Sequence, residues 1–550
     1  MKELSEVLQD WEAVIGLEIH TELTALDTKM FCNCKLSHDD EPNANVCPVC
    51  LGLPGALPVP NKRAIESIVK AGLATNCEIQ RHSMFYRKHY FYPDMAKNFQ
   101  TTQGPVAFAM YGHLDLDVTG RGAAERPDCA FGEAEAQSLA SASANAEGLS
   151  TSMTSTMREG NQRAGHLASY DASNLQMPER REDGSYTVPI RILRIHMEED
   201  AGKLNHDPWE DVTLVDYNRG GTPLIEIVTE PDFRSAEEVT AFLEKLRATL
   251  KYLGVSDCKM QEGSMRADVN LSVRPAGSTE LGTRTEMKNL NSLKAIGRAI
   301  NYEFRRQCEV IEEGGTVVQQ TRRWDENKDA SYAMRSKENA HDYRYFPDPD
   351  LVPIVISDEW LEEVRESLPE MPEAKKARYM DQFGLTEYDS SIITSSKPIA
   401  DLFEEAADIC KKPKDVANWI MGDLMKLLND SGTEADDVSF DPAKLAAVVE
   451  LVDKGTVNRN TAKRVFEEVY RSNVDPEQYV KEQGLGMITD EAAVLSGIEK
   501  VLAANEKAVA DYKGGNQKTF GFIVGQVMKE FRGKADPALI NRLLKEALNR

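Results

Sequence analysis

The chain has 550 residues, of which 90 are acidic and 65 basic, and its formal net charge is −25. With 41% hydrophobic and 28% charged residues, the composition predicts a globular protein of about three or four domains and excludes a small disulfide-stapled scaffold and a wholly disordered chain. No apolar run approaches the roughly 18 residues of a membrane-spanning helix, and the acidic start lacks the features of a signal peptide, so we expect a cytoplasmic protein without a membrane partner.

The first predicted element is an alternating strand over residues 14–23. One face carries Glu18, His20 and Glu22, and the other carries Ile15, Leu17 and Ile19, because side chains alternate between the faces of a strand. Three polar groups on one face suit a metal or acid–base site. The alternative is a solvated strand face, which is common where a sheet has one face in water.

Four cysteines follow the strand as a C-x-C pair, twelve intervening residues and a C-x-x-C pair. They are Cys32, Cys34, Cys47 and Cys50. Two chelating pairs joined by a short loop can wrap one tetrahedral Zn²⁺, so we predict a structural zinc knuckle over residues 32–50. The alternative is a set of free core thiols, but the other five cysteines are scattered along the chain, and nine cysteines without an export signal do not suggest a disulfide framework.

Residues 84–94 interleave aromatic and basic side chains. Arg87 and Lys88 stand among rings that include Tyr90 and Tyr92. Such a segment can stack unpaired bases and contact phosphates at an RNA end, or it can be an aromatic strand that lines a core. Beyond it, a stretch of about 120–185 has few large apolar residues, and we interpret it as a flexible insertion.

Acidic residues gather around the next predicted strands. Glu198, Glu199 and Asp200 end a short apolar strand, and residues 213–218 and 223–228 flank an Arg-Gly-Gly-Thr sequence that predicts a hairpin. In its second strand, Glu226 shares a face with apolar residues, so we expect an at least partly buried carboxylate that is either paired or bound to a cation, and a better ligand candidate than any surface acid. Glu286 precedes a helix capped at residue 291 or 292. Carboxylates with an imidazole suit Mg²⁺ better than Zn²⁺, and no Walker loop is present.

Helical periodicity defines the rest of the chain. A helix is predicted from Ser235, with Glu238 completing a capping box and Gly254 ending it. From about residue 296 helices dominate, so the fold class is α+β: a mainly antiparallel-sheet domain over 1–295, a connecting helical region over 296–400 and a helical bundle over 401–550. The bundle has a basic tail from about residue 485, and the last fifty residues contain nine basic and five acidic side chains, Lys529 and Arg532 among the former.

These segments together resemble the B subunit of tRNA-dependent amidotransferases, which convert Glu-tRNA(Gln) or Asp-tRNA(Asn) to the amide. The resemblance rests on an ordered series along nearly the whole chain: VIGLEIHTEL, NVCPVCLGLPGALPVPNK, RKHYFYPD, HMEEDAGKL, NRGGTPLIEIVTEPD, GVSDCKMQEGSMRADVN, EMKNLNS, DYRYFPDPDLVPI and NWIMGDL. Such a series is far more specific than any single motif. The long segment between Leu116 and Tyr186 departs from the pattern.

The resemblance implies a cradle-shaped catalytic domain and a helical tail that contacts tRNA. It also implies that ATP and Mg²⁺ are used to phosphorylate the side-chain carboxylate of the misacylated amino acid. Ammonia from an amidase (A) subunit, in a complex with a small C subunit, would then displace the phosphate. By motif, His20, Glu199, Glu226 and Glu286 match magnesium-site positions, with Glu199 and Glu226 as the catalytic acids; Glu18 and Glu198 are their neighbours.

An alternative is a non-catalytic adaptor that binds the end of a tRNA and retains only the zinc knuckle and the tail. Four converging cation ligands would have no purpose in an adaptor, so their presence favours the enzyme subunit. For the RNA partner, we expect contacts from Arg87, Lys88, Tyr90 and Tyr92 and from Lys529 and Arg532 in the tail. This local distribution compensates for the unfavourable net charge of the chain.

Overall fold

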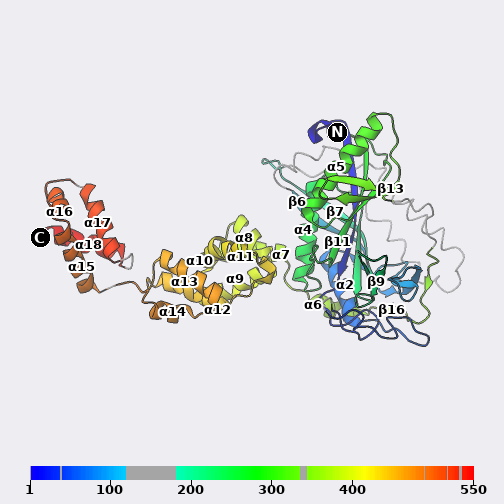
Figure 1. Cartoon of the computed structure of the whole chain (residues 1–550), viewed down its shortest axis with the longest axis horizontal. Coiled ribbons are helices and arrows are strands. Elements are labelled where there is room, and N and C mark those ends of the chain that lie inside the picture. Colours follow the sequence, from blue (N-terminus) through cyan, green and yellow to red (C-terminus); the bar gives the residue numbers. More distant parts are fainter. Residues whose placement is uncertain are drawn as a thin grey trace. The chain divides into compact units, whose positions relative to one another are not determined.

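The computed structural model describes residues 2–37, 40–118, 181–207, 209–334, 343–488, 490–516, 518–531 and 535–549. It divides into two compact units, Met1–Pro369 (unit 1) and Glu370–Arg550 (unit 2), each described here by itself (Figure 1). Most of the predicted insertion, residues 119–180, lies outside the described residues, and so does Arg532.

Unit 1 is built on one large sheet with β1 (Trp11–Glu22) near its middle. Its neighbours are β11 (Met265–Pro275) on one side and β10 (Pro223–Thr229) on the other, both antiparallel. Beyond β11 lie β12 (Thr285–Lys288), β13 (Gln320–Asp325) and β14 (Ala330–Ala333); beyond β10 lie β7 (Tyr186–Glu199), β5 (Phe99–Gln103), β4 (Phe85–His89) and β15 (Phe346–Pro347). The β12–β13 pair is parallel. The α+β class and the mainly antiparallel sheet are thus confirmed.

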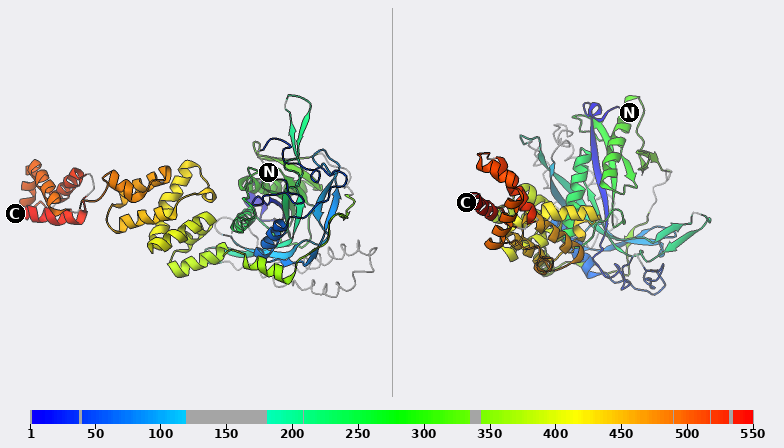
Figure 2. Two further views of the ribbon diagram at one scale, coloured as in Figure 1. Left: turned by 90° about the horizontal axis from the view of Figure 1, so that it is seen from below. Right: turned by 60° about the vertical axis from the view of Figure 1, so that its left-hand side comes forward.

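Alternation along β1 separates an apolar face of the sheet from a polar one. Ile15, Leu17 and Ile19 are buried, whereas Glu18 and His20 on the other face are partly exposed. Helices α2 (Lys62–Ala74), α4 (Ala236–Tyr252) and α5 (Leu293–Glu312) pack against the sheet, with α4 and α5 beside its long strands (Figures 1 and 2). Thr285, on the apolar face, donates to Glu303 of α5 at 2.8 Å. The polar face is therefore the one turned away from α5.

The predicted helix start and stop are confirmed at α4. The Ser235 side chain accepts a hydrogen bond from the backbone N–H of Glu238, which satisfies a donor that the first turn leaves free. The Glu238 carboxylate accepts from the N–H of Arg234 rather than that of Ser235. Gly254 follows the helix with φ +64°, a left-handed conformation that suits glycine. At α5 the cap is Ser292.

The predicted hairpin of residues 213–228 is wrong. β9 (Thr213–Asp216) pairs with β8 (Lys203–His206) in a separate two-stranded sheet, whereas β10 pairs with β1 and β7. The reason lies in the turn between them. Gly221, at φ +85°, donates to the carbonyl of Asp200, and Asp200 donates to the carbonyl of Thr222, both at 2.9 Å. The turn therefore redirects the chain from the small sheet into the large one instead of folding it back.

The predicted end of the sheet domain also differs from the structure. Unit 1 continues to residue 369 instead of ending at 295, because α5 and strands β13 to β15 belong to it and Trp324 of β13 is fully buried. At the predicted insertion, β6 (Ala109–Val118) pairs with β7 up to Val118 and Tyr186, so the two ends of the insertion are cross-strand partners. Other elements of unit 1 are α1 (Leu4–Val7), β2 (Glu78–Ile79), β3 (His82–Ser83), β16 (Ile354–Val355) and α6 (Asp358–Glu366).

Unit 2 consists of helices, as predicted. They are α7 (Pro372–Phe383), α8 (Glu387–Thr394), α9 (Lys397–Cys410), α10 (Pro413–Trp419), α11 (Met425–Ser431), α12 (Pro442–Asp453), α13 (Arg459–Ser472), α14 (Pro476–Glu482), α15 (Glu491–Ala504), α16 (Glu506–Lys513), α17 (Lys518–Glu530) and α18 (Pro537–Asn549), with a π-helical segment over Ile420–Leu424. One apolar core lies between Tyr379 and Val480, and a second between Val494 and Leu548. None of the described helices combines the length and apolar character needed to cross a bilayer.

Candidate functional site

The centre of the polar face is Glu226, in the middle of β10. The strand register places it directly opposite His20 of β1 and His196 of β7. Oε2 of Glu226 lies 3.3 Å from Nε2 of His20, and Oε1 lies 3.5 Å from Nδ1 of His196. The predicted buried carboxylate is thus found between two imidazoles.

One further acid joins each imidazole. Glu18 lies 3.7 Å from Nε2 of His20, and Glu198 lies 3.0 Å from Nε2 of His196. Each imidazole and its acid, together with Glu226, bring their ligand atoms within 4.8 Å of one another. We refer to the five residues as the acid–histidine cluster: Glu18, His20, His196, Glu198 and Glu226. Because Glu226 belongs to both groups, the cluster offers two adjoining positions for a cation.

The charges in the cluster are tightly coupled. Burial and the neighbouring Glu226 charge raise the pKa of Glu18. Burial alone would lower the pKa of His20, but its hydrogen bond to Glu226 and the surrounding acids raise it. Burial alone would raise the pKa of Glu198, but the hydrogen bond and charge of His196 lower it to about 2. Carboxylates this close favour any positive charge among them.

The donor set fits a hard divalent cation. Carboxylate oxygens outnumber ring nitrogens in the cluster, and no cysteine contributes to it, so its donor set can hold a divalent cation. Among the described atoms, Nδ1 of His196 is buried and has no hydrogen-bond partner. A buried unsatisfied ring nitrogen is costly, and a bound ion in this space would provide a partner for it.

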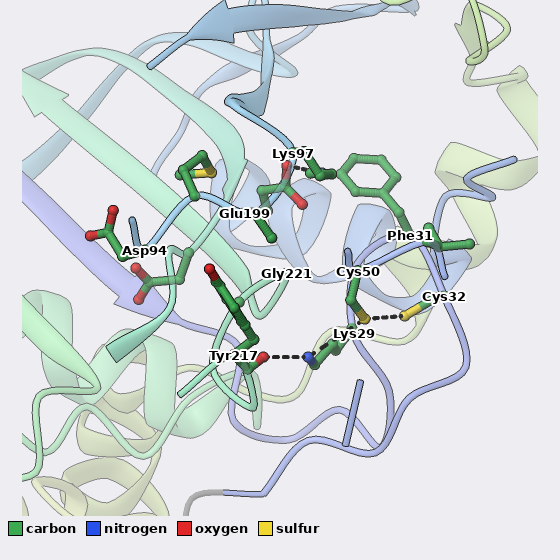
Figure 3. Close-up of a pocket in the computed structure, with 14 residues that line it drawn as sticks. Lys29, Phe31, Cys32, Cys50, Asp94, Lys97, Glu199, Tyr217 and Gly221 are labelled. Atoms are coloured by element: carbon green, nitrogen blue, oxygen red, sulfur yellow. Dashed lines mark hydrogen bonds and ion pairs between the residues drawn. The ribbon is translucent and has the colours of Figure 1, made fainter. Parts of the chain in front are cut away.

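Glu199, which the motif match assigned to the magnesium site, does not join the cluster. Its side chain points to the other face of β7, where its Oε1 pairs with Lys97 and accepts the N–H of Thr101 at 2.7 Å (Figure 3). Adjacent residues of a strand point to opposite faces. Glu198 therefore occupies the position expected of Glu199.

Glu286 lies on β12, outside both groups. Lys288 lies 3.0 Å from its Oε1, and Thr321 donates to its Oε2 at 2.8 Å. Lys288 also pairs with Asp268, which stands opposite Glu18 in the register of β1 and β11. The structure thus brings together His20 and Glu226 of the four predicted ligands, with Glu286 two strands away from β1.

The four cysteines of the predicted knuckle converge. Sγ of Cys50 lies 3.4 Å from that of Cys32 and 3.7 Å from those of Cys34 and Cys47. Four sulfurs at about 2.3 Å from a central Zn²⁺ would be about 3.8 Å apart in a regular tetrahedron. The cysteine cluster therefore has nearly the dimensions of a Zn(Cys)₄ site, and its donor set fits that ion.

Arg87, predicted to contact RNA, is engaged within the protein. Its Nε and Nη2 bond both oxygens of the buried Asp348 at 3.0 and 3.1 Å, and Nη2 also reaches Asp350 at 2.7 Å. These acids belong to the YFPDPD sequence, whose Phe346 pairs with Arg87 across β15 and β4. The guanidinium therefore holds this segment on the sheet.

The neighbouring residues of β4 differ in their surroundings. Burial would lower the pKa of Lys88, but Glu198 and nearby tyrosines raise it. Lys88 lies on the same face of the sheet as Glu198, because Tyr86, two positions before it, and Glu198 both stand opposite Thr102. The rings of Tyr90 and Tyr92 lie 5.8 Å apart, with Tyr92 half-exposed. In unit 2, Lys529 of α17 is exposed. The exposed side chains remain available for a ligand.

Three cluster members were not selected from the sequence as site residues: Glu18 and Glu198 were named only as neighbours of the predicted ligands, and His196 was not named as a candidate. His196 and Glu198 lie two positions apart on β7, and Glu198 precedes the chosen Glu199 by one. The period of two in a strand joins His196 to Glu198 on one face and would have excluded Glu199. The sequence alone does not show which side chains of β7 lie on the same face of the sheet as Glu226; the register of β7 and β10 shows it.

Comparison with known protein families identifies the family to which the chain belongs. Residues 13–362 match the profile described as "GatB/GatE catalytic domain", and residues 401–548 match the one described as "GatB domain". The chain belongs to the GatB/GatE family. The catalytic-domain match covers the acid–histidine cluster and the cysteine cluster, and the GatB-domain match covers Lys529.

Relatives within the GatB/GatE family cover the chain almost end to end. A protein of Lachnoclostridium phytofermentans, named as the B subunit of an aspartyl/glutamyl-tRNA(Asn/Gln) amidotransferase, is 49% identical over 540 residues, which span 98% of this chain and 99% of that one. A protein of Caldicellulosiruptor bescii with the same name is 48% identical over 544 residues, spanning 98% and 100%.

Proposed function

We propose that the chain is the B subunit of a tRNA-dependent amidotransferase. It would use ATP and Mg²⁺ to activate the side-chain carboxylate of Glu-tRNA(Gln) or Asp-tRNA(Asn), and then form Gln-tRNA(Gln) or Asn-tRNA(Asn). The acid–histidine cluster carries the proposal, because five acid and imidazole side chains that converge on one sheet face offer the ligand atoms of a divalent-cation site. The names of the two relatives support the assignment of substrate.

The reaction needs two displacements. A carboxylate is a poor acyl donor, so one of its oxygens attacks the γ-phosphorus of ATP and ADP leaves. Ammonia then attacks the acyl carbon, the carbon–oxygen bond to phosphate breaks, phosphate leaves with the electron pair, and the nitrogen loses a proton. Bound Mg²⁺ would neutralise charge on the phosphoryl group in transfer.

Within this scheme the chain's own residues position and neutralise the reactants. Glu226, His20 and Glu18 would hold one cation, and Glu198 and His196 would extend the site on the other side of Glu226. Lys88 lies on the same face of the sheet as Glu198 and would contact a substrate oxygen. Glu226 is thus the residue on which both halves of the site depend.

Partners and further contacts follow from the same assignment. Ammonia would come from glutamine through an amidase A subunit, with a small C subunit completing a heterotrimer. We propose that the polar face of the sheet lines a cradle for the aminoacylated tRNA end, that Tyr90 and Tyr92 stack on its bases, and that Lys529 and Arg532 contact its backbone. The cysteine cluster would hold a structural Zn²⁺.

The test is Glu226→Ala, co-expressed with the two partner subunits, with the exposed Glu262→Ala as the matched control. We expect Glu226→Ala to abolish ADP formation that depends on misacylated tRNA and to leave tRNA affinity nearly intact, and Glu262→Ala to behave as the unaltered complex. Full activity of Glu226→Ala would contradict the proposed site. Tight tRNA binding without any ADP formation by the unaltered complex would favour an adaptor instead.

A further inference from the structure

Lys29 is a fully buried lysine in the loop that follows β1, with 1% of its surface exposed. Its Nζ donates to the carbonyl of Tyr217 at 3.0 Å and to Sγ of Cys50 at 3.6 Å (Figure 3). Among the residues that the structure describes, no carboxylate forms an ion pair with it. A buried ammonium requires a compensating negative charge, and the atom in contact that can carry one is the sulfur of Cys50.

Cys50 also lies within 3.7 Å of each of the other three sulfurs of the cysteine cluster. Four thiolates around one Zn²⁺ leave a net charge of −2 in a half-buried place. That charge is costly unless a donor or cation lies beside it. The thiolates thus supply the negative charge that the buried ammonium of Lys29 requires, and Lys29 supplies the positive charge and the hydrogen-bond donor that the thiolates require.

The second hydrogen bond of Lys29 reaches the segment between β9 and β10. Asn43, between the two cysteine pairs, is bonded to this segment three times: its N–H donates to Asp216 at 2.9 Å, its side chain donates to Val215 at 3.0 Å, and its side-chain oxygen accepts from Tyr217 at 2.8 Å. Asn45 donates to Asn218 at 2.8 Å. The loop of the cysteine cluster therefore follows residues 215–218 closely.

The same segment leads directly into the strand that carries Glu226. Met30 donates to the carbonyl of Gly221 at 2.9 Å. A Cβ on Gly221 would lie 3.5 Å from Cδ of Lys29, so the lysine stem packs under this turn. The adjoining cavity is only about 20 Å³, room for about one water molecule. The position of Lys29 is therefore closely fixed between the cysteine cluster and the turn.

We propose that Lys29 is a positioning residue that donates an N–H···S hydrogen bond to the zinc-bound thiolate of Cys50 and an N–H···O bond to Tyr217. It thereby couples the zinc knuckle to the turn that sets β10, and with it Glu226. This inference rests on the zinc site of the proposed function. Partners of this kind commonly change metal affinity by about 10-fold to 100-fold.

The first experiment measures the rate of zinc release to a colorimetric chelator from the co-expressed complex. Lys29→Met retains the stem and removes the donor; Lys29→Arg restores a charged donor; Lys35→Met removes an exposed charge from the same loop and is the control. We expect release to be about 10-fold or more faster for Lys29→Met, partly restored for Lys29→Arg and unchanged for Lys35→Met. Equal rates for Lys29→Met and the unaltered complex would overturn the proposal.

Two further measurements distinguish a hydrogen bond from Lys29 to the Cys50 sulfur from a general contribution of Lys29 to the stability of the fold. In the Co²⁺-substituted complex, loss of an N–H···S bond makes the thiolate a better electron donor, so the sulfur-to-cobalt absorption should move to lower energy in Lys29→Met and not in Lys35→Met. In the unaltered complex, zinc removal should accelerate hydrogen exchange of residues 215–222. The hydrogen-exchange measurement uses the unaltered complex, so it is decisive even if Lys29→Met does not fold. Unchanged exchange of residues 215–222 after zinc removal would overturn the coupling between the zinc knuckle and the turn.

The outcomes also distinguish the two assignments. Unaltered complex that is purified without zinc and binds no Co²⁺ would contradict the zinc site and the role of Lys29 together. Zinc at one equivalent, with neither release rate nor cobalt absorption affected by Lys29→Met, would contradict the role of Lys29 alone.

Discussion

Glu198 and Glu199 are neighbours in sequence but lie on opposite faces of β7. Glu198 is 3.0 Å from His196 and belongs to the acid–histidine cluster, whereas Glu199 pairs with Lys97 beside the cysteine cluster. A motif match assigns both residues to one stretch of acids, but the strand separates them into two environments with different chemistry.

The first prediction follows from this separation. Glu198→Gln should weaken Mn²⁺ binding, measured by electron paramagnetic resonance with Mn²⁺ in place of Mg²⁺, by about 10-fold or more, because it removes a charged ligand. Glu199→Gln should retain Mn²⁺ affinity within about 2-fold, since it alters the Lys97 pair instead. A larger loss of Mn²⁺ affinity in Glu199→Gln than in Glu198→Gln would indicate that Glu199, and not Glu198, is the metal ligand.

The second prediction concerns Arg87 and RNA. Arg87→Lys should destabilise the β4–β15 pairing by about 1–3 kcal/mol, because lysine cannot reproduce the bidentate bonds to Asp348. Hydrogen exchange of β4 amides measures this loss. In Arg87→Gln, which removes the charge, the slope of log tRNA affinity against log salt should stay unchanged, since the guanidinium is already occupied within the protein; a slope reduced by about one would show that Arg87 contacts a phosphate.

The third prediction concerns the tail. Truncation after Gly484 removes the whole core between Val494 and Leu548 and retains every buried residue of the core that ends at Val480. The truncated complex should bind tRNA more weakly and with a flatter salt dependence, because basic contacts are lost. The point variant Lys529→Gln should reduce the slope by about one. An unchanged slope in the truncated complex would mean that the tail is only a solvated surface.

The fourth prediction uses a buried ion pair behind the sheet. Glu303 of α5 is fully buried and bonds Arg306 at 2.7 and 2.8 Å. Burial alone would raise the pKa of Glu303, but Arg306 outweighs it and lowers the pKa below its ordinary 4.5. Glu303→Gln should cost about 3–5 kcal/mol at neutral pH, measured by native-state hydrogen exchange of α5, because it removes the counter-charge of Arg306 and of the buried Arg322, which lies 3.3 Å away.

The pH dependence of that cost has a definite sign. A lowered folded pKa stabilises the protein above the ordinary value, and the contribution is lost as pH falls through the folded value. The difference between the unaltered protein and Glu303→Gln should therefore be full above about pH 5 and shrink with acidification. Exposed Glu280→Gln is the control, expected to show no difference. A difference that grows on acidification would contradict the assignment.

The features that could be predicted from the sequence are those set by residues close together in the chain. The alternation of β1, the Ser235 cap and the cysteine pairs each fix a contact within a few positions, and the structure retains all three. Glu226 was also predictable, since an acid between apolar neighbours on a strand requires a partner.

Features that depend on distant residues were not predictable in this way. The turn at Gly221 resembles a hairpin turn, yet its bonds go to Asp200, which lies before β8. Arg87 seemed a free cation because its partner Asp348 is 261 positions away. The position of Glu198 required the register of β7 and β10, which puts Glu198 on the same face of the sheet as Glu226.

The pairing of Val118 with Tyr186 has a consequence for how chain length can vary. Paired residues on adjacent strands lie about 5 Å apart, a gap that a turn of two to five residues spans. Neither the register of β6 and β7 nor the distance between His196 and Glu226 depends on how many residues join the two strands. The tip of this hairpin is a position where evolution, or a protein engineer replacing residues 119–185 by a short turn, can change the length of the protein without moving its acid–histidine cluster.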